Sequence, residues 1–276
     1  MQLDLQQLTR ELQHSPVGHT IDYHGSIAST MPVAHHLAAQ PLTRSGTIVV
    51  AEEQTAGRGR LQRQWEAPVG EALLVSIILK APFPFAPMQL PMLAGVATAQ
   101  ALERFAPALQ GQIGLKWPND VLLGHNMDDA GKVAGILLES TFQKTELLYA
   151  IFGIGINVNQ KVAALPVGQP NAPRPTSLRS YMGQSFERTT LLIALCQSLG
   201  EYLTADPSGV ELSAAWRSRL WTLGQAVSVR ENLDSEPVFT GRAVDVTADG
   251  GLVVEDENGV QRIFAAGDVS IRTQAS

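Results

Sequence analysis

The chain has 276 residues, 45% of them hydrophobic and 17% charged, with a formal net charge of −6. This composition is typical of a globular protein with a sizeable core, and the acidic balance argues against binding nucleic acid through a basic face. The single cysteine, Cys196, excludes an internal disulfide and a thiolate metal cluster, while the polar start and short apolar runs predict a cytoplasmic protein that does not bind a membrane.

The first half of the chain mixes helical and extended patterns. Leucines at positions 3, 5, 8 and 12 predict a short amphipathic helix. Ser29 and Thr30, followed by Pro32, predict the capped start of a helix that continues to residue 39. Apolar runs predict strands over 47–52 and 72–80, and a 3.6-residue period predicts a helix over 88–105. Further strands are expected over 112–117, 121–123, 132–140 and 147–157.

The second half starts with a loop over 160–176 that contains four prolines and few large apolar residues. Helices are predicted over 189–203 and 210–220. From residue 224 the pattern changes to short alternating runs separated by Asp249-Gly250 and Asn258-Gly259, which are hairpin signals. We therefore expect two domains, a larger one over 1–223 and a small β-barrel over 224–276.

The most informative stretch is 54–60, QTAGRGR, here named the arginine loop. It places Arg58 and Arg60 between glycines, directly after an apolar run. Glycine lets the backbone approach a bound group, and the guanidinium is a rigid, permanently charged fork that matches a carboxylate or phosphate. The loop alone fits a surface turn equally well. It has neither the Gly-Lys-Ser/Thr of a P-loop nor the third glycine of a dinucleotide fingerprint.

Three further stretches lie at the start or the end of predicted strands and carry polar or glycine residues: 116–120 (KWPND), 132–135 (KVAG) and 153–159 (GIGINVN). The first of them places a lysine, an amide and a carboxylate around a proline turn, which suits phosphate chemistry. The sequence therefore predicts an anion site assembled from several strand ends.

In this order, the stretches resemble those of the biotin protein ligases, and the resemblance runs from about Ile21 to the C-terminus. That family has a Gly-Arg-Gly-Arg loop, a Lys-Trp-Pro-Asn-Asp turn, a Lys-x-Ala-Gly strand and a Gly-x-Gly-x-Asn turn. It also has a Ser-Thr pair, here Ser29 and Thr30, and a Thr-Ser-Leu element, here 176–178. The resemblance implies an α+β fold with a central mixed β-sheet and flanking helices, as in class II synthetases, followed by an SH3-like β-barrel.

The resemblance also implies an ATP-dependent ligase that forms biotinyl-5′-AMP, releases pyrophosphate, and transfers biotin to a lysine of a biotin carboxyl carrier protein domain. The acceptor would belong to acetyl-CoA carboxylase or a related biotin-dependent carboxylase. The implied cofactors are ATP and Mg²⁺, the metal without assigned ligands. The implied biotin-binding residues are Ser29, Thr30, Gln54, Arg58, Gly59, Arg60, Lys132 and Gly135. The implied nucleotide-binding residues are Arg60, Arg63, Trp65, Lys116, Asn119 and Asn157, and the implied catalytic residues are Arg58, Lys116, Lys132 and Asp120.

Some assignments have alternatives. Asp120 could position Mg²⁺ or help deprotonate the acceptor lysine, or it could only cap the turn after Pro118. A homodimer is possible. The chain departs from the family pattern at Met31, where the family often has Asn, and at 61–62, where Leu and Gln replace an arginine and a glycine. The loop over 160–176 is a candidate for part of a cover that keeps water from the adenylate.

The sequence argues against two other functions. A ligase that also represses transcription needs a DNA-binding domain of about sixty residues, and only about twenty residues precede Ile21, so DNA binding is not expected. A lipoate ligase or octanoyltransferase shares the fold but would lack the paired arginines. The transferases also need an active-site cysteine, for which Cys196, in an apolar helix stripe, is poorly placed.

Overall fold

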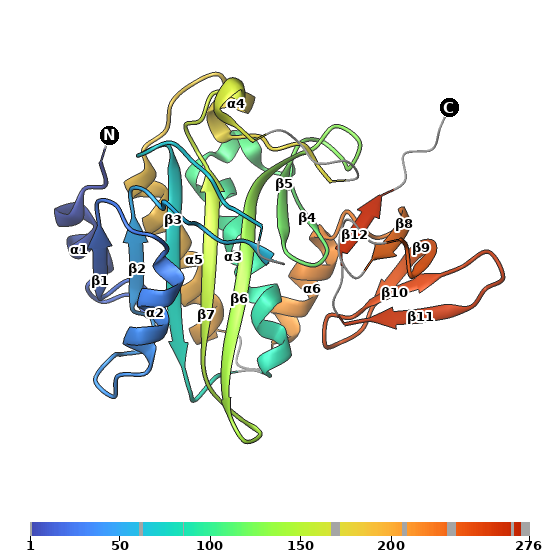
Figure 1. Ribbon diagram of the computed structural model, residues 1–276, viewed down its shortest axis with the longest axis horizontal. Helices are drawn as coiled ribbons and strands as arrows, with labels where there is room; N and C mark the ends of the chain where they lie inside the picture. The colour runs from blue at the N-terminus through green and yellow to red at the C-terminus, as the bar shows by residue number, and fades with distance from the viewer. Residues whose placement is uncertain are drawn as a thin grey trace.

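The structure of the chain, a computed structural model, describes residues 2–60, 63–84, 86–166, 172–205, 209–230, 236–265 and 268–271. Within these ranges the strands form a large sheet and a small C-terminal sheet next to it (Figure 1).

The large sheet has seven strands in the order β1-β2-β3-β7-β6-β5-β4. β1 and β2 are parallel, and all other neighbouring strands are antiparallel, so the sheet is mixed as predicted. β7 lies between β3 and β6 although it follows β6 in the chain. The strands are β1 (Ile21–His24), β2 (Ile48–Ala51), β3 (Ala72–Lys80), β4 (Ile113–Lys116), β5 (Asp120–Leu123), β6 (Gly131–Gln143) and β7 (Glu146–Asn157).

Helices cover both faces of this sheet because its central strands are apolar on both sides (Figure 1). α2 (Thr30–Ala38) covers one face, where Ala34 packs with Val49, Ile78 and Ile151. α3 (Leu90–Phe105) and α5 (Arg188–Ala205) pack against each other on the opposite face. The remaining helices are α1 (Leu5–Leu12), which packs on α5, α4 (Leu178–Met182) and α6 (Val210–Arg219), with 3₁₀ turns η2 (Pro87–Gln89), η3 (Pro107–Leu109) and η4 (Val162–Ala164).

The small sheet is antiparallel, with strand order β11-β10-β9-β8-β12. Gly250 and Gly259 occupy the two predicted hairpin turns with φ of +83° and +77°, a region that glycine adopts without strain. The turn at Gly250 contacts the turn between β4 and β5 of the large sheet, since the indole N–H of Trp117 donates to the Gly250 carbonyl at 2.9 Å. The strands are β8 (Ala226–Arg230), β9 (Phe239–Val246), β10 (Leu252–Glu255), β11 (Gln261–Phe264) and β12 (Asp268–Ile271).

The predicted helices and strands are all present, with ends displaced by a few residues. β6 extends to Gln143 because it pairs with β7 as far as the hairpin between them. The strand β1 and the short helix α4 were not predicted from the sequence. The predicted domain boundary at 223/224 falls between α6 and β8 and stays a prediction. Over the described ranges, no helix combines the length and apolarity needed to cross a bilayer.

Candidate active site

One cavity of about 460 Å³ opens where several strand ends of the large sheet meet. All of the residues that the sequence singled out for a site line it. They are Ser29, Thr30, Gln54, Arg58, Gly59, Arg60, Arg63, Trp65, Lys116, Asn119, Asp120, Lys132, Gly135 and Asn157.

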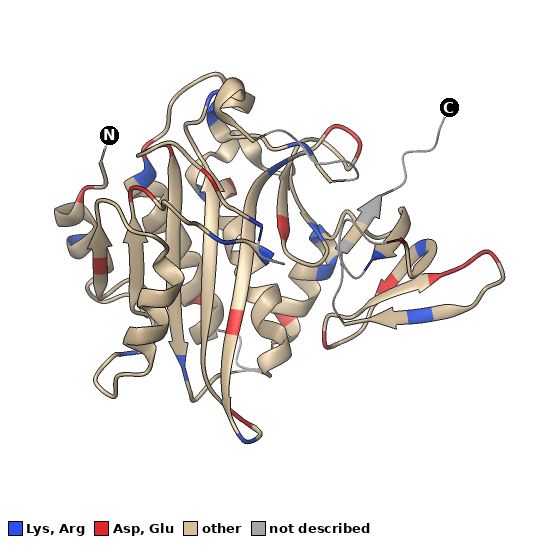
Figure 2. Ribbon diagram, in the orientation of Figure 1, with Lys and Arg blue, Asp and Glu red and all other residues tan. Residues whose placement is uncertain are grey.

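The arginine loop is the first half of a narrow hairpin. The amide of Trp65 donates to the carbonyl of Gly57 at 3.0 Å, and the amide of Gly59 donates to the carbonyl of Arg63 at 2.7 Å. Residues 61 and 62, where the sequence departs from the family pattern, lie outside the described residues. The segment that joins β2 to β3 crosses the sheet in front of β7 and β6 and carries several of the blue stretches in Figure 2. The hairpin therefore brings its cations over the centre of the sheet.

Two glycines form a floor under the indole of Trp65. A Cβ atom on Gly155 would lie 2.5 Å from Trp65 Cε2, and one on Gly135 would lie 2.9 Å from Cζ3. Gly135 and Gly155 are register partners on β6 and β7, so both positions face the same ring. The absence of side chains at these two positions is what allows the ring to approach the sheet, which explains the glycines in the predicted strand-end motifs.

A polar cluster forms one end of the cavity at the start of α2. The side-chain oxygen of Gln54 accepts from the Thr30 amide at 2.8 Å and from the Thr30 hydroxyl at 3.0 Å. The Thr30 hydroxyl also lies 2.7 Å from that of Ser76 on β3. Ser29 is the N-cap of α2, as predicted, and the next residue, Met31, is buried with its sulfur against Gly153. Gln54 and Thr30 are thus fixed before any ligand binds.

Cations surround a single carboxylate at the other side of the cavity. Lys132 Nζ lies 2.6 Å from Asp120 Oδ1, and both side chains are largely buried. Burial by itself would raise the pKa of Asp120, but the charges of Lys132, Lys116 and Arg60 outweigh it and hold that pKa below its ordinary value. Lys132 Nζ also lies 5.9 Å from the Trp65 ring centroid. Asp120 is therefore ionised at neutral pH and holds Lys132 in place.

Asn119 links the KWPND turn to the arginine loop. Its side-chain oxygen accepts from Arg60 Nη1 at 3.2 Å, and its amide nitrogen donates to the Ile136 carbonyl on β6 at 2.8 Å. At the end of β7, the side-chain oxygen of Asn157 accepts from Gln160 Nε2 at 2.8 Å. Two of the side chains predicted for nucleotide contact, Arg60 and Asn119, are thus linked directly to each other and through Asn119 to β6.

The net charge inside the cavity is opposite to that of the whole chain. Five basic side chains and two acidic ones line it, the acidic ones being Glu66 and Asp120. The chain as a whole carries −6. Fixed cations gathered in a partly closed cavity are suited to ligands that bring several negative charges.

Several lining residues have no strong signal in the sequence. Val269 of β12 reaches the cavity from the small sheet, and Ile136 and Leu137 line it from β6. The C-terminal part of the predicted cover also lies here: Lys132 donates its amide to the Arg174 carbonyl at 2.8 Å and accepts from the Thr176 amide at 2.9 Å. Residues 167–171 of that loop are outside the described residues, so its role as a cover stays a prediction.

The side chains that the structure describes do not form a protein site for Mg²⁺. Among the described residues, no group of three or more His, Cys, Asp or Glu side chains lies close enough together to hold a metal ion. Asp120, one of the two carboxylates that line the cavity, is paired with Lys132. The geometry therefore favours the positioning of Lys132 over metal binding as the role of Asp120. It also disfavours proton abstraction, since a carboxylate with a lowered pKa is a weak base.

The lowered pKa of Asp120 predicts how the Asp120→Asn variant responds to pH. A carboxylate with a lower pKa in the folded than in the unfolded chain contributes stability above the unfolded value of about 3.9, and loses it as pH falls through the folded value. The stability difference between the parent chain and Asp120→Asn in urea unfolding should therefore be largest between about pH 5 and 7 and should shrink as pH falls below about 4 toward the folded pKa. A difference that is constant from pH 3 to 7 would contradict the assignment.

Comparisons with known proteins agree with this geometry. The sequence matches the model of the biotin/lipoate A/B protein ligase family over residues 24–157 and that of the biotin protein ligase C terminal domain over 222–272. The bifunctional ligase/repressor BirA of Bacillus subtilis is 33% identical over 260 residues, which are 92% of this chain and 75% of the relative. The biotin–[acetyl-CoA-carboxylase] ligase of Paracoccus denitrificans is 31% identical over 236 residues, which are 84% of this chain and 94% of the relative.

Among solved structures, the biotin protein ligase of Aquifex aeolicus in complex with biotin and ATP superimposes with a TM-score of 0.68 at 29% identity. The match covers 92% of this chain and 98% of that one.

Proposed function

This chain belongs to the biotin/lipoate protein ligase family, and on that basis we propose that it is an ATP-dependent biotin protein ligase that works in the cavity described above. It activates biotin as biotinyl-5′-AMP with release of pyrophosphate and then transfers biotin to a lysine. The observation that carries the proposal is the convergence of five cations from separate segments beside the fixed Gln54–Thr30 cluster and the glycine floor.

In the first step a carboxylate oxygen of biotin attacks the α-phosphorus of ATP, and the bond to pyrophosphate breaks. The two reactants are both anions, so their approach is opposed by repulsion that fixed cations offset. Lys132, Arg58 and Arg60 are proposed to face the carboxylate, with Gly59 and Gly135 beside them. Each preorganised contact to the developing charge is worth about 3 kcal/mol, as for oxyanion donors elsewhere.

The remaining residues are proposed to hold the two ligands. The ureido ring of biotin would lie by Ser29, Thr30 and Gln54, where Gln54 already accepts two hydrogen bonds. The nucleotide would contact a second set of side chains, within which the Arg60–Asn119 hydrogen bond links the arginine loop to the KWPND turn. That set comprises Arg60, Arg63, Trp65, Lys116, Asn119 and Asn157. Asp120 would act by positioning Lys132.

In the second step the amine of the acceptor lysine attacks the carbonyl of the mixed anhydride, the C–O bond to phosphate breaks, and AMP leaves. No enzyme nucleophile takes part. Cys196 fits this account, because it is buried in α5 and burial raises its pKa to about 12, which makes it a poor nucleophile. This argues against an octanoyltransferase, which would need a reactive thiol.

The acceptor is proposed to be a biotin carboxyl carrier domain of acetyl-CoA carboxylase or a related carboxylase, as the name of the Paracoccus relative suggests. Mg²⁺ is proposed to enter with the ATP phosphates. We also propose that the enzyme acts in the cytoplasm, where its buried free thiol would stay reduced. Action without DNA and a possible homodimer stay predictions.

The test compares two acids. The chain is incubated with ATP and either biotin or lipoate, pyrophosphate release is measured, and a carrier domain is then weighed by mass spectrometry. We expect release with biotin and one added biotinyl group on the carrier lysine. Pyrophosphate release with lipoate but not with biotin would assign the chain to the lipoate branch of the family.

A further inference from the structure

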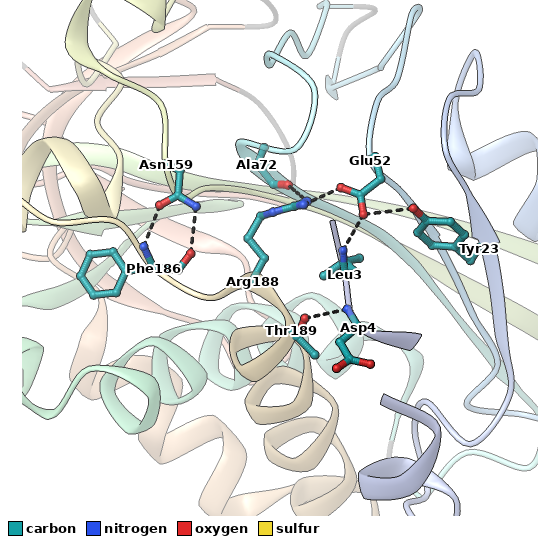
Figure 3. A network of polar contacts seen from close by, with 9 residues as sticks. All are labelled: Leu3, Asp4, Tyr23, Glu52, Ala72, Asn159, Phe186, Arg188 and Thr189. Carbon is teal, nitrogen blue, oxygen red and sulfur yellow. Dashed lines mark hydrogen bonds and ion pairs between the residues drawn. The ribbon is translucent and has the colours of Figure 1, made fainter. Parts of the chain in front are cut away.

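A buried ion pair joins the two ends of the segment that carries the arginine loop. This segment, residues 53–71, connects β2 to β3 and is here named the β2–β3 segment. Arg188, at the start of α5, donates from Nη2 to Glu52 Oε2 at 2.5 Å and from Nη1 to the Ala72 carbonyl at 3.0 Å (Figure 3). Glu52 comes directly before the segment and Ala72 directly after it. One guanidinium therefore contacts both of its ends.

The pair is fully enclosed and has further partners. The Glu52 and Arg188 side chains are each 2% exposed. The second carboxylate oxygen of Glu52 accepts from the Leu3 amide at 2.7 Å and from the Tyr23 hydroxyl at 3.2 Å (Figure 3). Burying two charges costs free energy that good geometry and extra hydrogen bonds must offset. This network supplies both.

The pair lies where the backbone pairing of the sheet stops. The ladder between β2 and β3 ends at Ala51 and Leu74. Beyond it, the Gly70 amide donates to the Glu52 carbonyl at 3.0 Å, and Arg188 bridges Glu52 and Ala72. Ala72 is in turn the register partner of Asn157 on β7, which lines the cavity. The ion pair thus fixes the base of the segment and the adjoining wall together.

We propose that Glu52 and Arg188 are positioning residues that clamp the base of the β2–β3 segment and so hold Arg58, Arg60 and Trp65 at the cavity. They lie outside the cavity's catalytic and binding groups and act through the segment. The effect of this clamp on catalysis rests on the proposed function, whereas its effect on the position of the β2–β3 segment does not.

The test uses the full chain and removes both charges at once, because removing one would leave the other buried without a partner. The variant is Glu52→Leu/Arg188→Met. The control is Arg104→Met/Glu201→Leu, which makes the same side-chain replacements at an exposed two-pronged Arg–Glu pair, at 2.6 and 2.5 Å, between α3 and α5. Trypsin cleavage after Arg58, Arg60 and Arg63 is followed by mass spectrometry, with cleavage after Lys144 in the β6–β7 hairpin as the internal reference.

We expect cleavage in the β2–β3 segment to be about tenfold faster in Glu52→Leu/Arg188→Met, with cleavage at Lys144 unchanged, since local opening exposes only the segment. The factor by which the KM for biotin rises should be about ten times the factor by which kcat falls, because a loosened segment binds biotin less well. The control pair should leave both measurements at the parent values. Unchanged segment cleavage in the folded variant overturns the proposal.

If the double variant does not fold, the single variant Arg188→Lys tests the proposal in its place. It keeps a cation beside Glu52 but cannot span Glu52 and Ala72 with a planar fork. The proposal then requires faster segment cleavage with Lys144 cleavage unchanged, and equal cleavage refutes it. A parent chain that releases no pyrophosphate from ATP with biotin would refute the proposed function instead, while the trypsin comparison still tests the clamp.

Discussion

Replacing Lys132 by alanine is expected to lower biotin-dependent pyrophosphate release by about 10³-fold while the chain stays folded. Lys132 is the cation that Asp120 holds at 2.6 Å and that lies beside the Trp65 ring. Its removal takes away the charge proposed to meet the carboxylate and phosphate in the first step. Because the cation is preorganised, the loss falls on the transition state, so kcat should fall more than the KM for biotin rises.

Lys80→Ala is the matched control for this variant. Lys80 is the last residue of β3, at the end of the strand away from the cavity. Its Nζ donates to the Gln40 carbonyl at 2.9 Å. It should keep the parent rate. Pyrophosphate release within about threefold of the parent in folded Lys132→Ala would remove Lys132 from the catalytic residues. Arg58→Ala is expected to be similarly inactive.

Replacing Arg60 by glycine is expected to turn the enzyme into a source of free adenylate. Arg60 Nη1 donates to Asn119 Oδ1 at 3.2 Å, which joins the arginine loop to the KWPND turn across the cavity. Without this link, and with a more flexible residue in the loop, biotinyl-5′-AMP should leave before transfer. Biotin on lysines of a bystander protein such as albumin, measured by avidin blot, should rise about tenfold, which corresponds to about 1.4 kcal/mol of lost binding.

Arg44→Gly controls for the loss of an arginine from a loop. Arg44 is exposed and precedes β2 at the end away from the cavity. That variant should label only the carrier domain, as the parent does. If Arg60→Gly also labels only the carrier, while still forming adenylate, Arg60 does not retain the intermediate.

The match between sequence and structure is closest where the signal is local. Apolar runs predicted β2 and β3, and the Asp-Gly and Asn-Gly pairs predicted the hairpin turns at Gly250 and Gly259, whereas the edge strand β1 was not predicted. The cap at Ser29 is present as expected. In each case the decisive interactions join residues a few positions apart, so the pattern alone contains them.

Local sequence patterns did not predict which charged side chains pair with each other in the fold. Asp120 had three open roles in the sequence, and its pairing with Lys132 follows from β5 lying beside β6. Glu52 and Arg188 had no signal at all, since a glutamate after a strand and an arginine opening a helix also fit solvated surface charges. Their contact spans 136 positions of the chain.

By itself, the sequence determined which segments are suited to an anion, since glycines beside arginine and lysine offer close approach and fixed charge whatever surrounds them. Only the tertiary structure decided that these segments share one cavity. The position of β7 between β3 and β6 places Asn157 beside Ala72 of β3 and Gly155 beside Gly135 of β6, and packing between elements far apart in the chain places Val269 of β12 and Arg188 of α5. Such contacts depend on strand order and register, which are set by burial of the whole core and not by any local stretch.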